Sequence, residues 1–181
     1  MPGEVGIWVF IFMDMWWFSI MFGVVVWTRG QHHALFEQGR HTLTLWAGTL
    51  NTVLLLTASL FVVQGLQAIR RNKPELSRRM FGLAMLCALG FLINKGFEWG
   101  RLLDHHHHPG SNDFYTYFFI ITGIHAVHLL LGTAGLGYMR RVTRRPNIGR
   151  TEMRNLEVVA CYWHLVDLLW VVIFAVFYLM R

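Results

Sequence analysis

Five apolar runs, each long enough to cross a lipid bilayer, constrain this chain more than any other feature of its sequence. A membrane-spanning helix needs about 20 consecutive, mostly apolar residues, because each residue adds about 1.5 Å along the axis. Of the 181 residues, 55% are hydrophobic and 14% charged, whereas soluble domains carry about a quarter charged residues. The sequence therefore predicts an all-α integral membrane protein, a five-helix bundle in which residues 1–181 form one transmembrane domain. The predicted helices cover roughly residues 4–28, 46–69, 80–99, 114–138 and 157–180.

Positive charge is concentrated in two connections between these runs. The formal net charge is +6 at pH 7, and basic loops of membrane proteins stay on the cytoplasmic side. We therefore expect a multi-pass protein of the bacterial inner (plasma) membrane, with a cytoplasmic N-terminus, a periplasmic C-terminus and no nucleic-acid partner. The charge also favours contact with anionic lipids. The basic residues of the two connections are Arg70, Arg71, Lys73, Arg78 and Arg79, and then Arg140, Arg141, Arg144, Arg145, Arg150 and Arg154.

Ionisable side chains occur inside the apolar runs, where an unpartnered charge costs a few kcal/mol on insertion scales. Each such residue therefore needs a partner or a function. We predict that they form a proton-active or structural polar network, together with Glu157 at the start of the fifth run. The residues inside the runs are Asp14, Lys95, Glu98, His125, His128, His164 and Asp167.

Two of these residue pairs have the spacing of neighbours on one helical face. Lys95 and Glu98 are three residues apart, and so are His164 and Asp167; residues at this spacing lie one above the other on a helix. We expect the first pair to form an intramembrane ion pair, which lowers the cost of both charges. In the second pair, the carboxylate can orient the imidazole or share a proton with it.

The histidines allow three functional interpretations. His125 or His128 could bind a b-type haem opposite His164, or the HxxH spacing could supply two ligands to a metal. The third interpretation is a network without a cofactor in this chain. We favour the third, because two histidines one turn apart cannot be trans ligands of one haem, and because membrane hydroxylase centres need more histidines.

A run of four histidines, His105–His108, lies between the third and fourth predicted helices. Such tracts bind divalent metals readily, but adjacent residues cannot all reach one ion in regular structure. We expect His105, His106, His107 and His108 to be weak, incidental metal ligands. The same interpretation applies to His32, His33 and His41 in the predicted loop after the first helix.

Several motifs resemble subunit III of the haem-copper respiratory oxidases. The G-x-H-x-x-H segment at 123–128 is similar to a segment of that family, and Tyr162–Trp170 resembles its Y-W-H-F-V-D-x-x-W helix. The segment Leu50–Leu56 resembles the pattern of its second run, and Glu98 stands where the family has a carboxylate late in the third run. Asp14 matches a membrane carboxylate near the route of protons or oxygen to subunit I. The likeness is to the short, five-helix form, as in bacterial quinol oxidases.

The resemblance implies a cofactor-free, non-catalytic subunit, with haem and copper in partner subunits I and II. Its expected role is to stabilise the catalytic subunit, to support proton uptake and to bound a phospholipid-lined path for oxygen. One alternative is the NorE-type branch, which would associate with nitric oxide reductase subunits. A second alternative, from a different class, is a self-sufficient membrane haem or metal protein that uses His125, His128 and His164.

Overall fold

The protein is described by a computed structural model that covers residues 5–145 and 148–180. These residues form six α-helices and a terminal π-helical turn, and five of the α-helices are long and apolar enough to cross a membrane. The prediction of an all-α chain with five such helices is therefore confirmed. The elements are α1 (Val5–Gln31), α2 (His33–Thr42), α3 (Leu45–Arg70), α4 (Pro74–Asp104), α5 (Asp113–Val142), α6 (Arg150–Phe174) and η1 (Ala175–Leu179).

The long helices extend beyond the apolar runs that predict them. α4 begins at Pro74 instead of residue 80, and α6 begins at Arg150 instead of residue 157. Proline is favourable in the first helical turn, because its missing N–H would have no helical partner there. Polar residues thus continue each helix past the apolar part, a continuation that hydropathy does not detect.

The expectation of a loop between the first two spans was wrong, because residues 33–42 form α2, a helix too short to cross a bilayer. Phe36 and Gly39 of α2 are buried. The Phe36 ring meets the Phe114 ring edge-on at 5.5 Å, and a side chain at Gly39 would collide with that same Phe114 ring. Docking of one apolar edge on α5 therefore stabilises α2.

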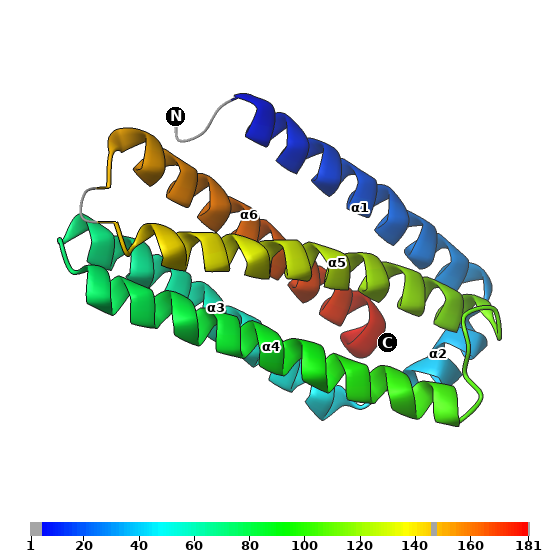
Figure 1. Ribbon diagram of the computed structural model, residues 1–181. Coiled ribbons are helices and arrows are strands. Elements are labelled where there is room, and N and C mark those ends of the chain that lie inside the picture. Colours follow the sequence, from blue (N-terminus) through cyan, green and yellow to red (C-terminus); the bar gives the residue numbers. More distant parts are fainter. Residues whose placement is uncertain (1–4, 146–147, 181) are drawn as a thin grey trace.

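The helices form a bundle in which α1 is the least enclosed member. α3 and α4 pack as an antiparallel pair, α5 and α6 pack against it, and α1 runs along α5 and α6 (Figure 1). In the most apolar window of α1, 11% of residues are buried, against 28–44% in the other four long helices. Most of α1 therefore presents apolar side chains to its surroundings.

The two ends of the bundle differ in chemistry. The arginine-rich connections after α3 and after α5 lie at one end together with the start of α1, and α2 and the 105–112 connection lie at the opposite end (Figure 1). We call these the arginine-rich end and the histidine-rich end. Their placement at opposite ends agrees with alternating spans, while the side of the membrane that each end faces stays a prediction.

Candidate functional site: polar contacts between the helices

The polar residues inside the bundle find most of their partners on other helices. His128 of α5 places Nε2 3.0 Å from Asp14 Oδ1 of α1, and its Nδ1 lies 2.8 Å from the Ile124 carbonyl oxygen. A carbonyl oxygen only accepts, so Nδ1 carries a hydrogen. A hydrogen bond between Nε2 and Oδ1 then requires one further proton, which either atom can hold.

The Asp14–His128 pair is thus neutral overall in both of its protonation forms, as imidazolium with carboxylate or as imidazole with carboxylic acid. Neutrality lowers the cost of placing the two groups at membrane depth. Their side chains are 10% and 16% exposed, and Asp14 Oδ2 has no hydrogen-bond partner among the described residues. The geometry therefore allows the pair to share one proton between Nε2 and Oδ1.

His164 of α6 bonds to Ser59 of α3, with Nδ1 and Oγ 2.6 Å apart. Asp167 interacts electrostatically with both the Ser59 hydroxyl and the His164 ring, and its Oδ1 has no partner among the described residues. His164 and Asp167, which the i, i+3 spacing predicts to be neighbours, therefore both interact with a serine from another helix. This serine was not among the sequence-predicted site residues.

His125 occupies a different environment from the second histidine of its motif. Its side chain is buried, and neither ring nitrogen has a hydrogen-bond partner among the described residues. The ring lies 5.8 Å from the Phe91 ring and 5.4 Å from the Trp170 ring. The aromatic packing holds His125 in place within the bundle.

Lys95, Glu98 and Tyr178 form what we call the buried ion-pair cluster. Lys95 Nζ lies 2.6 Å from Glu98 Oε2, as the spacing predicts, and donates to the Tyr178 hydroxyl at 3.1 Å. The Tyr178 hydroxyl lies 2.6 Å and 2.7 Å from the two carboxylate oxygens. The Nζ also lies 4.4 Å from the Phe118 ring centroid and 5.1 Å from that of Trp170, so aromatic faces stabilise the cation.

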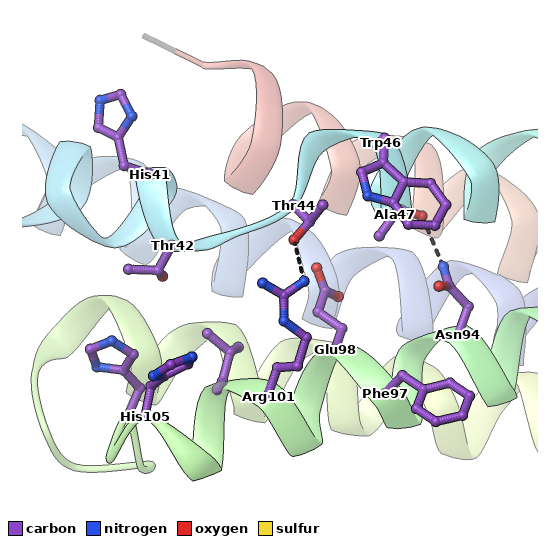
Figure 2. A pocket seen from close by; sticks show the side chains of 12 residues that line it. His41, Thr42, Thr44, Trp46, Ala47, Asn94, Phe97, Glu98, Arg101 and His105 are labelled. Carbon is purple, nitrogen blue, oxygen red and sulfur yellow. Dashed lines mark hydrogen bonds between the residues drawn. The ribbon is translucent and has the colours of Figure 1, made fainter.

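A cavity of about 660 Å³ lies at the histidine-rich end between α2, α3 and α4 (Figure 2). Arg101 donates to Thr44 Oγ1 at 3.2 Å, and Asn94 donates to the Ala47 carbonyl oxygen at 3.0 Å, as the dashed lines in Figure 2 show. Glu98 also lines this cavity. The buried ion-pair cluster therefore reaches a polar hollow at one end of the bundle.

The remaining predicted site residues lie near the ends. Glu157 accepts a hydrogen bond from Arg70 at 2.8 Å, in an ion pair at the arginine-rich end. His105 and His107 line the cavity beside α2, and the His107 ring stacks on Tyr115 with centroids 4.4 Å apart. Among residues 5–145 and 148–180, no three His, Cys, Asp or Glu side chains gather as a metal site would require.

Most of the chain matches a known protein family. Residues 40–181 match the family model described as cytochrome c oxidase subunit III. The chain belongs to this family. The matched region contains α3 to α6, the buried ion-pair cluster and the His164–Ser59 contact. Most of the polar contacts described above therefore lie within the part of the chain that matches the family.

Curated subunit III proteins extend the similarity to α1. The chain is 27% identical to cytochrome c oxidase subunit 3 of Corynebacterium diphtheriae over 98% of its own length and 88% of the relative's. It is 24% identical to the protein of that name from Thermostichus vulcanus over 97% and 86%. For the Synechocystis subunit 3, the identity is 28% over 79% and 60%. Together with the five apolar helices, these matches support a multi-pass membrane protein.

Proposed function

We propose that the chain is a non-catalytic subunit III of a haem-copper respiratory oxidase in a bacterial inner membrane, where it stabilises the catalytic subunit and supports proton uptake. The observation that carries this proposal is the family match over residues 40–181. The cytochrome c oxidase relatives favour oxygen over nitric oxide as the acceptor of the complex. Association with the other oxidase subunits follows from the same match.

The exposed surface of α1 supports a partner subunit at that face. Trp16 is 64% exposed, Phe12 69% and Met13 65%, and Asp14 lies among them on the same helix. A companion polypeptide that covers this surface, with subunit I as the expected one, would lie beside the Asp14–His128 pair. A proton held by that pair would then be available next to the interface.

The contacts of His128 argue against its use as a haem or metal ligand. A ligand needs a free ring nitrogen with a lone pair, and His128 uses both of its ring nitrogens, on Asp14 and on the Ile124 carbonyl. His164 uses Nδ1 alone, on Ser59, and His125 uses neither nitrogen on a described residue. The proposal that haem and copper belong to the partner subunits therefore rests mainly on the family match, with the residues of this chain supplying proton-holding and packing contacts.

Purification through an affinity tag on the full chain tests the proposal. The expected result is co-purification of a larger, haem-bearing polypeptide with oxygen-consuming activity. Recovery of the chain alone with a Soret absorbance band would contradict it and favour the self-sufficient haem protein. Co-purification with nitric oxide reductase subunits would favour the NorE-type alternative.

Asp14→Asn in the purified complex tests the proton-uptake part. Asparagine can donate an amide N–H to the lone pair of His128 Nε2 but cannot carry the exchangeable proton, so assembly should persist while oxygen consumption falls, most strongly at alkaline pH, where protons are scarce. Glu75→Gln, which removes a carboxylate that is 70% exposed at the start of α4, is the matched control. An unchanged pH profile for Asp14→Asn would refute the proton role.

A further inference from the structure

A partly exposed histidine, His164, lies halfway along α6, where that helix packs against α3. His164 is at the middle of the 30-residue apolar span Arg150–Leu179, and its partner Ser59 is near the middle of the 26-residue span Leu45–Arg70. At about 1.5 Å per residue, both residues are at least about 15 Å from the ends of their helices. The contact between them is therefore deep within the apolar part of both helices.

The contacts of this cluster determine which nitrogen of His164 carries the lone pair. The Asp167 carboxylate attracts the hydrogen of the Ser59 hydroxyl, because an ionised carboxylate only accepts. A hydroxyl has one hydrogen, so Ser59 Oγ is left to accept from His164 Nδ1, which lies 2.6 Å away. A neutral imidazole with its hydrogen on Nδ1 has its lone pair on Nε2. His164 Nε2 is therefore a hydrogen-bond acceptor.

This acceptor is unpaired within the described part of the chain. His164 Nε2 has no hydrogen-bond partner among the described residues, and the bundle does not fully enclose it. Acyl chains donate no hydrogen bonds, and an unsatisfied polar group in hydrocarbon is costly. A cover of lipid tails would therefore leave Nε2 unpaired, whereas a polypeptide could supply a donor.

The surroundings of His164 have the character of a helix-packing surface. Leu168 and Val171 on α6 are 51% and 37% exposed, and Leu56 and Leu60 on α3 are 51% and 54% exposed. We call these four residues and His164 the His164 face. Membrane helices associate through packing of apolar side chains and through hydrogen bonds between helices, and histidine is one of the residues that form such bonds. The His164 face combines both features.

We propose that the His164 face binds a transmembrane helix of another polypeptide, and that a hydroxyl, amide or indole side chain of that helix donates a hydrogen bond to His164 Nε2. An ionised carboxylate is excluded as the partner group, because it only accepts. The face is formed by α3 and α6, so it is a second surface beside the one on α1. The inference rests on the proposed function only for the presence of a companion polypeptide.

Photo-crosslinking of the full chain in native membranes tests the surface. A benzophenone amino acid in place of Leu168 should form an adduct with another polypeptide. Mapping should place that adduct in a transmembrane segment with a serine, threonine, tyrosine, tryptophan, asparagine or glutamine within one turn. The same crosslinker in place of Leu86, which is 64% exposed on α4, is the matched control and should not capture that segment.

Four outcomes would overturn the proposal: an adduct with lipid alone, an adduct with a second copy of this chain, a mapped segment without a donor, or equal capture of the same segment from Leu86. A mapped adduct with a donor-bearing helix of a polypeptide that binds no haem would support the His164 face while contradicting the oxidase function. The two proposals can therefore fail separately.

Nitrogen-15 NMR of the histidine-labelled chain in the purified complex tests the direction of the hydrogen bond. The His164 signals, identified by their loss in His164→Gln, should show a hydrogen on Nδ1 and none on Nε2. A hydrogen on Nε2 would overturn the proposal, because the partner group would then have to accept.

Retention of the partner in detergent provides a third measurement. His164→Leu removes the acceptor and should lower the fraction of chain that keeps the partner by about threefold, the factor for an average hydrogen bond between membrane helices. His164→Gln should keep more of it, because the side-chain oxygen of glutamine can still accept. An equal loss in the two variants would count against a hydrogen bond at Nε2.

Discussion

Lys95→Met should destabilise the bundle far more than the double replacement Lys95→Met/Glu98→Gln. Methionine keeps an unbranched apolar side chain but removes Nζ, which lies 2.6 Å from Glu98 Oε2 with both side chains at most 6% exposed. Loss of one partner of a buried ion pair costs about 3–5 kcal/mol, because the other charge stays buried without compensation. The hydroxyl of Tyr178 still donates to that carboxylate, so we expect a value near the lower bound.

The two single replacements should differ because the aromatic surroundings favour a cation. In Glu98→Gln, the Lys95 ammonium keeps the faces of Phe118 and Trp170, and a desolvated cation–π contact contributes up to about 2 kcal/mol. In Lys95→Met, the same faces offer nothing to the Glu98 carboxylate. Removal of both charges leaves neutral side chains, and such replacements of buried pairs are often close to neutral in stability.

Thermal unfolding of the purified complex, followed through a fluorescent tag on this chain, measures all three variants. The coupling energy from the double-mutant cycle should be a few kcal/mol in magnitude. Lys73→Met is the matched control, since it removes a lysine charge at the exposed start of α4, and it should have little effect. The reasoning fails if Lys95→Met and the double variant lose the same stability.

Two further predictions concern the other polar residues. Ser59→Ala removes the partner of His164 Nδ1 and should lower stability by about 1–3 kcal/mol. Ser19→Ala, which removes a hydroxyl bonded to the Met15 carbonyl within α1, should lower stability much less. An equal loss of stability in the two variants would speak against a stabilising contact between Ser59 and His164. Replacement of residues 105–108 by asparagine should weaken retention of the complex on immobilised nickel but leave oxygen consumption intact, and a large loss of activity would assign a function to that loop.

The spans could be predicted from the sequence because hydropathy over about 20 residues decides them. The helix ends and α2 could not, since polar residues continue the helices and since α2 depends on the docking of Phe36 against Phe114. A hydropathy window averages over such single contacts. The resemblance at residues 123–128 and 162–170 indicated the family, which the match over residues 40–181 then established.

The polar partners were predictable only where they lie on one helix. The i, i+3 spacing points directly to Lys95–Glu98, whereas the contact of His128 with Asp14 depends on how two distant helices are rotated about their axes. Tyr178 belongs to a terminal apolar run, and nothing in its local pattern separates it from an interfacial tyrosine. Contacts of this kind need the packed bundle, because no local spacing encodes them.

The pairing of α1 with α5 has a consequence for how the first helix is seated. Apolar helices in lipid can slide past one another with little change in buried surface, but a shift of one turn, about 5.4 Å, would separate Asp14 from His128. Near the other end of α1, the Thr28 hydroxyl lies 3.4 Å from that of Tyr117 on α5. These two contacts fix the axial register of a helix whose remaining surface is mostly exposed. The face that α1 presents to a neighbouring subunit is therefore positioned by contacts within this chain.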